Sequence, residues 1–192
     1  MIAGHFGLAA AVKSGARQVP LWALMLATVW LDIIFVPLFL AGIETLERVP
    51  GVDRSYGGSI IHADYTHSLV GALILSALFG LAFGWRWGRV VGSILGLVVF
   101  SHWLLDLIVH RGDMPLLPGQ SAQWPKLGWG LWQFPAASIA AELFLVLAGS
   151  WLYWRAAVTT AGPDLRPRAH WAGALMLVGG IAVLVADAGI LP

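Results

Sequence analysis

Ser-His-Trp-Leu-Leu-Asp-Leu-Ile-Val-His-Arg-Gly-Asp, residues 101–113, ends a long apolar run and contains several ionisable side chains. His102, Asp106 and His110 are spaced four residues apart, so on a helix they lie along one stripe. An ionisable group in hydrocarbon costs about 2.5–3.5 kcal/mol, so its presence in an apolar segment indicates a site. Because His and Asp one turn apart can ligate the same metal ion, this stretch predicts part of a metal site inside a membrane protein.

The composition of the whole chain favours the same setting. Of its 192 residues, 59% are hydrophobic and 11% are charged, and the mean hydropathy is +0.81. Soluble domains carry about 25% charged residues. The chain has no cysteine, so a metal site must use His, Asp, Glu or water. The net charge of +1 gives no electrostatic support for a nucleic-acid partner.

We predict an all-α fold, a polytopic membrane helical bundle that forms a single integral-membrane domain over residues 1–192. A spanning helix needs about 20 residues, and we predict five spans: Pro20–Leu40, Thr66–Trp85, Val90–Val109, Gly130–Trp154 and Trp171–Leu191. The shorter apolar segment Ile2–Val12 is expected to form a short N-terminal helix that enters the membrane or packs on the bundle.

The segments between the predicted spans are expected to be loops. Ala41–Tyr65 is polar and rich in glycine, and His110–Gly128 is rich in proline and glycine. Asp64 and Thr66 immediately precede the second predicted span, and either side chain can cap its first turn.

The positive residues predict the orientation of these spans. Seven of them fall on one side of the predicted bundle: Lys13, Arg17, Arg86, Arg89, Arg155, Arg166 and Arg168. The other four are Arg48, Arg54, Arg111 and Lys126. We therefore expect an integral protein of a bacterial-type inner membrane, with its N-terminus in the cytoplasm.

Polar side chains in four predicted spans fall at similar depths. At about 1.5 Å per residue, Asp32, His67, His102, Asp106 and Glu142 lie about 18 to 28 Å from the cytoplasmic ends of their spans. This layer is in the outer half of a bilayer core about 30 Å thick. We therefore predict a metal centre held by Asp32, His67, His102 and Asp106, with His5, His62, His110, Asp64 and Glu142 around them.

The donor set is nitrogen and oxygen only. It fits a divalent metal, with zinc first and manganese or iron as alternatives. A bound metal makes hydroxide available at neutral pH, which is hydrolytic chemistry.

His62-Ala-Asp-Tyr-Thr-His-Ser68, followed by His102-x-x-x-Asp106, resembles the family of LexA-binding, inner-membrane-associated metal-dependent hydrolases. Members carry a His-Arg-Gly-x-Thr-His-Ser segment and a later His-x-x-x-Asp. The family is in turn similar to zinc-dependent phospholipase C. On that pattern the resemblance implies the metal ligands His5, Asp32, His67, His102 and Asp106.

The chain departs from the family pattern at two places. Ala63-Asp64 stands where the family shows Arg-Gly, and Glu142 has no histidine four residues before it.

These observations predict a membrane-embedded metal-dependent hydrolase that acts on a phosphoester or lipid-like substrate at the outer face. Glu142 or Asp64 would serve as the catalytic base, and membrane lipid and membrane proteins are the expected partners. Two alternatives stay open. The chain could be a non-enzymatic accessory subunit of a larger membrane complex, or a haem-binding subunit in which His67 and His102 are the axial ligands.

Overall fold

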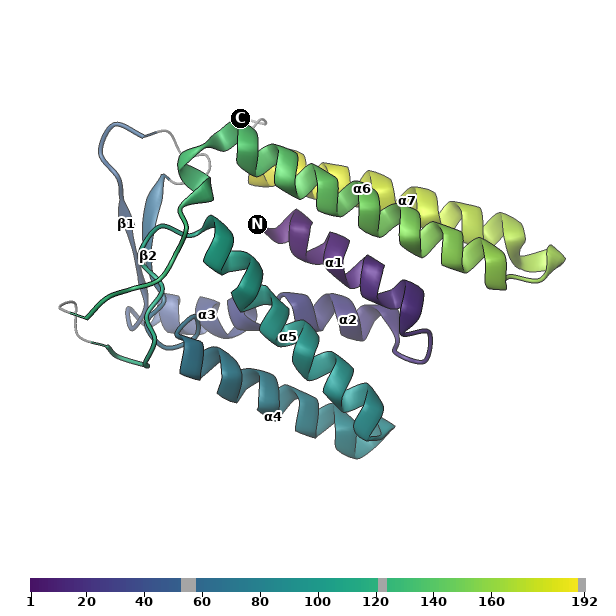
Figure 1. The fold of residues 1–192 in the computed structure, drawn as a ribbon, viewed down its shortest axis with the longest axis horizontal. Coiled ribbons are helices and arrows are strands. Elements are labelled where there is room, and N and C mark those ends of the chain that lie inside the picture. Colours follow the sequence, from purple (N-terminus) through teal and green to yellow (C-terminus); the bar gives the residue numbers. More distant parts are fainter. Residues whose placement is uncertain (53–57, 121–123, 190–192) are drawn as a thin grey trace. The chain divides into compact units, whose positions relative to one another are not determined.

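The computed structural model describes residues 1–52, 58–120 and 124–189. Within these ranges the chain is predominantly helical (Figure 1), which supports the predicted all-α class. Two compact units are present, and each is described by itself. Unit 1 comprises Met1–Leu26 and Ile139–Pro192, and unit 2 comprises Ala27–Ser138. The prediction of a single domain stays a prediction.

Four described helices are long and apolar enough to cross a membrane, and the number is five if a bent pair of helices is counted as one span. The four are α4 (Leu69–Trp87), α5 (Arg89–Val109), α6 (Pro135–Thr160) and α7 (Arg166–Asp187). The chain is therefore compatible with an integral membrane protein. The predicted spans match these helices with shifted ends, and residues 190 and 191 of the last span lie outside the described residues.

The first predicted span is not one continuous helix. It is divided into α2 (Leu21–Thr28) and α3 (Trp30–Leu40), which are bent by 47°. Val29, between them, has φ −115° and ψ 13°, outside the helical region. At this break the Thr28 carbonyl accepts a hydrogen bond from another element, α5 (Arg89–Val109), through His102 Nδ1. The break also places Asp32 in the first turn of α3.

Unit 2 is built on the hairpin of α4 and α5, which pack closely along their lengths (Figure 1). Glycines make this approach possible, because a Cβ at Gly92 would meet the backbone of Gly80 and Gly84. Ser68 caps α4 by accepting a hydrogen bond from the Gly71 amide at 3.0 Å. The expectation that Asp64 or Thr66 is this cap is wrong, because both precede Ser68 and point to other partners.

The segment expected to be a loop, Ala41–Tyr65, contains a two-stranded hairpin. Strand β1 (Thr45–Arg48) pairs antiparallel with β2 (Ser59–His62), with Thr45 opposite His62. Threonine and isoleucine favour extended backbone, a signal that the glycine content of the segment obscured. The described residues of the segment 110–128, which are 110–120 and 124–128, are mostly irregular, as predicted, with an isolated bridge between Met114 and Leu127.

Unit 1 contains α1 (Ile2–Gly15) beside α6 and α7. Two acidic side chains bind the first turn of α1. The Gly4 amide donates to Glu142 Oε2 at 3.1 Å, and the Ala3 amide donates to Asp187 Oδ2 at 3.0 Å. The first amides of a helix lack intrahelical acceptors and carry positive partial charge, so both carboxylates stabilise this helix end.

Candidate metal centre

Four predicted ligands converge within unit 2, from two helices and the turn before α4. Asp32 comes from α3, His67 from the turn, and His102 and Asp106 from successive turns of α5. The His67 carbonyl accepts a hydrogen bond from Trp103 Nε1 of α5 at 2.9 Å, which ties the turn to that helix. The predicted stripe of residues 102 and 106 is therefore present on α5. Asp32 of α3 and His67 of the turn lie beside it and complete the cluster of four.

The distances between the donor atoms are short and similar. His102 Nε2 lies 3.0 Å from Asp106 Oδ2 and 3.2 Å from His67 Nε2. His67 Nε2 lies 3.5 Å from both Asp32 Oδ1 and Asp106 Oδ2. Asp32 Oδ1 lies 3.6 Å from His102 Nε2. A tetrahedron with metal–ligand distances of about 2.1 Å has edges of about 3.4 Å. The five distances above are of this size, and Asp32, His67 and His102 lie close enough to share one metal ion, whereas Asp32 and Asp106 do not fall in one such group.

His102 is held in one tautomer. Its Nδ1 lies 2.6 Å from the Thr28 carbonyl oxygen, which can only accept a hydrogen bond. Nδ1 therefore carries the proton, and in the neutral ring the lone pair is on Nε2, toward the two aspartates. Metal-binding histidines commonly have this arrangement, in which one ring nitrogen donates to a carbonyl and the other ligates.

His67 reaches the same tautomer through a relay. The Thr66 hydroxyl lies 2.9 Å from Glu44 Oε2, and the carboxylate can only accept, so the hydroxyl donates to it. The hydroxyl oxygen then accepts from His67 Nδ1 at 2.8 Å. Glu44 is fully buried and also accepts from the amides of Tyr65 and Thr66. The His67 lone pair is thus directed at the cluster.

A third histidine, His110 of the sequence stripe, is oriented in the same way. His110 Nδ1 lies 3.0 Å from Asp113 Oδ1, and its Nε2 lies 3.7 Å from Asp106 Oδ2. The other carboxylate oxygen of Asp113 accepts from the Ile61 amide of β2 at 2.9 Å. The hairpin therefore helps to hold this histidine at the edge of the cluster.

Exposure is uneven across the four donors. The side chains of His67, His102 and Asp106 are at most 5% exposed, whereas that of Asp32 is 38% exposed. These groups could hold a metal ion, and Asp32, His67 and His102 form a triad of donor atoms close enough to do so. The same atoms also form ion pairs when a histidine is protonated.

Each of the remaining predicted residues is described within its own unit. His5 and Glu142 are buried in unit 1, where Glu142 binds the start of α1. Asp64 forms an ion pair with Lys126 at 2.9 Å. His62 lies on β2, 3.2 Å from Glu47. The roles predicted for His5 as a ligand, and for Glu142 and Asp64 as bases, stay predictions.

Sequence reasoning missed the residues that orient the histidines. Glu44 was assigned to a loop, and Thr28 and Asp113 were given no role. For Thr66, the sequence offers one signal, which is its position next to His67. For Glu44 and Thr28 it offers none, because their partners are far from them along the chain.

Comparisons of the chain with protein-family models, curated proteins and solved structures found no match. The resemblance to the LexA-binding hydrolase family therefore rests on the motif residues alone and stays a prediction.

Proposed function

We propose that this chain is a membrane-embedded metal-dependent hydrolase whose metal, zinc in the first instance, is held by Asp32, His67, His102 and Asp106. The observation that supports the proposal is the convergence of two histidine lone pairs and two carboxylates, with each carboxylate oxygen 3.0–3.6 Å from both histidine Nε2 atoms. Each histidine donates its other ring proton to a buried acceptor.

The charge balance favours a divalent cation over a proton in this cluster. Two neutral histidines and two carboxylates carry two negative charges, and the charge on Asp106 is buried, which is costly without compensation. Protonation of both histidines would place two N–H groups face to face across the 3.2 Å between their Nε2 atoms. Protonation of one would leave a net negative charge. A divalent metal compensates both carboxylates and all four lone pairs.

The proposed chemistry is the hydrolysis of a phosphoester or lipid-like substrate, at the outer face in the orientation predicted by the positive residues. A divalent metal lowers the pKa of a water that it binds to about 7, which supplies the nucleophile at neutral pH. The buried partners of His67 and His102 hold the imidazoles in the ligating orientation. Asp32 is the most exposed of the four, so we propose that substrate approaches from its side.

Elemental analysis of the detergent-purified protein, beside its visible spectrum, tests the metal centre. We expect about one zinc ion per wild-type chain and its loss in Asp106→Ala. Asp164→Ala is the matched control, because Asp164 is exposed on a separate 3₁₀ turn and should leave the metal content unchanged. Equal metal in both variants, or none in the wild type, would contradict the centre, and a strong Soret band would indicate haem.

Turnover is tested separately from metal content. Phospholipid vesicles are incubated with the wild type and with the double variant His102→Ala/Asp106→Ala, and released phosphate products are measured. We expect release by the wild type and loss of it in the double variant. Unchanged release would reject the proposed hydrolytic role of these residues.

A further inference from the structure

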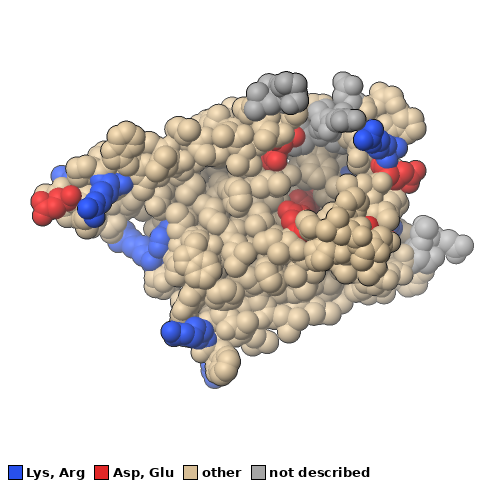
Figure 2. All heavy atoms as spheres, turned by 180° about the vertical axis from the view of Figure 1, so that it is seen from behind, with Lys and Arg blue, Asp and Glu red and all other residues tan. Residues whose placement is uncertain are grey.

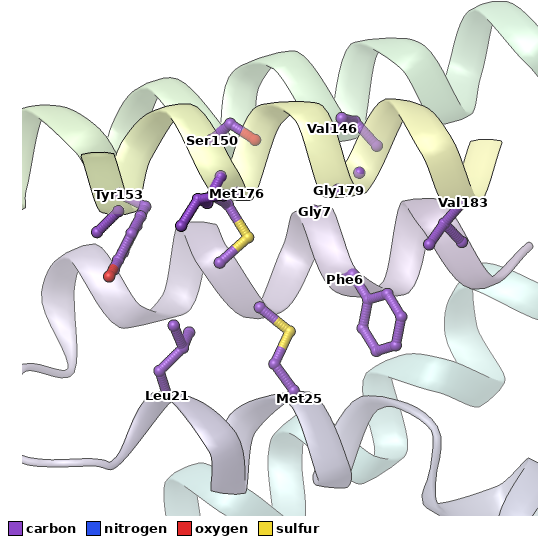
Figure 3. Close-up of a pocket in the computed structure, with 13 residues that line it drawn as sticks. Phe6, Gly7, Leu21, Met25, Val146, Ser150, Tyr153, Met176, Gly179 and Val183 are labelled. Carbon is purple, nitrogen blue, oxygen red and sulfur yellow. The ribbon is translucent and has the colours of Figure 1, made fainter. Parts of the chain in front are cut away.

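Unit 1 contains an apolar cavity that the metal centre does not involve. Its volume is about 510 Å³, within the range of small-molecule sites. In Figure 3, Phe6 of α1 and Met25 of α2 lie below the residues of α6 and α7 that line the cavity, which include Ser150 and Met176. Ser150 and Tyr153 are the polar side chains among the lining residues, and the other lining residues are apolar or glycine. The cavity is therefore suited to a hydrocarbon ligand.

The length of the cavity matches one leaflet of a membrane. On α7 the lining extends from Ala172 to Val183, about 16 Å at the rise of a helix. The hydrocarbon core of a bilayer is about 30 Å thick, so the cavity extends over about half of it. Since α6 and α7 are candidate spans, the ligand most available to such a cavity is a lipid acyl chain.

One end of unit 1 is basic. The hydrogen bonds of Gly4 with Glu142 and of Ala3 with Asp187 fix the direction of α1 relative to α6 and α7. The last turn of α1 therefore lies toward the end at which α6 joins α7. The basic residues of this end are Lys13, Arg17, Arg155, Arg166 and Arg168, beside one acidic residue, Asp164. Figure 2 shows basic side chains gathered at the end of the α6–α7 hairpin.

The two polar lining residues lie toward this basic end. Tyr153 is close to Arg155 along α6. On α7 the lining residue at the same end of the cavity, Ala172, is about one turn from Arg168. The Lys13 ammonium donates to the carbonyls of Arg17 and Val19 at 2.7 and 2.8 Å. These two hydrogen bonds hold the turn that follows α1 against the end of that helix. The arrangement is thus apolar along its length and cationic at one end.

We propose that this cavity binds one acyl chain of an anionic phospholipid, with the phosphate of that lipid at the basic end. The apolar lining accounts for the chain, and the cations account for the headgroup. The proposal does not depend on the metal centre or on hydrolysis, so either can fail without the other.

Gly179→Leu is the variant that tests the cavity. A Cβ at Gly179 meets nothing within 4 Å, so a leucine there fills space without displacing the backbone. Ala174→Leu is the matched control, because Ala174 is an exposed residue of the same helix that does not line the cavity. Phosphatidylglycerol is added to each purified protein in detergent, and bound lipid is counted by native mass spectrometry.

We expect one phosphatidylglycerol per wild-type or Ala174→Leu chain, and at least tenfold weaker binding by Gly179→Leu. Helical circular dichroism confirms that each variant is folded, and Met176→Phe replaces Gly179→Leu if that variant is not. Equal binding by the cavity variant and its control overturns the site, whether both bind or neither does.

The headgroup is tested with phosphatidylcholine. We expect the wild type to bind phosphatidylglycerol several-fold more tightly, and Arg155→Gln/Arg168→Gln to remove that preference. Inorganic phosphate should not displace the bound lipid, because it offers no acyl chain. An equal affinity for the two lipids, or displacement by phosphate, would overturn the proposal.

Discussion

At the scale of single residues, the described cluster is controlled by the atoms behind its histidines. Each histidine uses its Nδ1 atom in a hydrogen bond, to the Thr28 carbonyl, the Thr66 hydroxyl or the Asp113 carboxylate. The three Nε2 atoms therefore face the cluster. Rotation of any of these rings would break a buried hydrogen bond. The geometry of the proposed ligands is therefore set before a metal arrives.

Thr66→Val tests this relay, because valine has the shape of threonine without the hydroxyl. His67 Nδ1 and Glu44 would both lose a partner, so we expect zinc affinity to fall by about 10- to 100-fold. Competition with a chelating dye measures the affinity. Thr66→Ser keeps the hydroxyl and should retain most of the affinity.

The matched control for the threonine is Thr159→Val, at an exposed position of α6 where the hydroxyl bonds only to its own helix. It should bind zinc as the wild type does. Wild-type affinity in Thr66→Val would show that the relay does not orient His67.

Two roles can be tested for Glu142. The sequence predicts that it is a catalytic base, and the structure shows that it accepts a hydrogen bond from the Gly4 amide. Glu142→Gln keeps an oxygen that can accept this hydrogen bond, and Glu142→Ala does not. If Glu142 stabilises the first turn of α1, we expect only the alanine variant to unfold at a lower temperature. Its loss of stability should be about 0.5–2 kcal/mol. If Glu142 is the base, turnover is lost in the glutamine variant without loss of stability. Thermal unfolding and phosphate release measure the two effects.

At the scale of elements, the α4–α5 hairpin holds His102 and Asp106 in place through glycine contacts. Gly92→Ala would press a methyl group onto the backbone of Gly80 and Gly84. We expect this variant to lose about 1–3 kcal/mol of stability because a close-packed interface has no room for the added atom. Chemical unfolding in mixed micelles gives the free energy.

Gly179→Ala is the control for this substitution, because its Cβ meets nothing within 4 Å and alanine favours a helix over glycine. It should be as stable as the wild type or more so. Equal stability of Gly92→Ala and Gly179→Ala would show that α4 and α5 can separate at no cost.

The break between α2 and α3 has a consequence at the same scale. A continuous helix over Pro20–Leu40 would use the Thr28 carbonyl in its own hydrogen bonding, and His102 would lose its acceptor. The hairpin of β1 and β2 acts similarly, since the Ile61 amide holds Asp113 and Glu44 directly precedes β1. Irregular elements therefore supply the groups that orient the proposed ligands.

At the scale of the whole molecule, orientation in the membrane is open to a direct test. The chain has no cysteine, so a single introduced cysteine can be labelled without background. From the positive residues we expect Gln18→Cys and Thr160→Cys to react only from the cytoplasmic side, and Leu117→Cys only from the outer side. Impermeant maleimide, applied to intact cells and to inverted vesicles, distinguishes the two sides. The reverse pattern would contradict the predicted orientation.

The sequence by itself predicted the class of fold and the residue types of the proposed ligands. The excess of apolar residues predicts membrane helices, because few other structures satisfy the backbone in hydrocarbon. The spacing of residues 102 and 106 places both on one helix face, because helical periodicity is a local property. It also identified Asp32 and His67 as ionisable groups in costly positions.

Only the tertiary structure decided how these groups meet and which groups orient them. Glu44 and Thr66 are separated by many residues, as are Thr28 and His102, and their pairing depends on how helices and a hairpin fold back on one another. The break at Val29 and the strands within Ala41–Tyr65 were likewise missed. Local propensity there is weak, and contacts distant in sequence determine the backbone conformation.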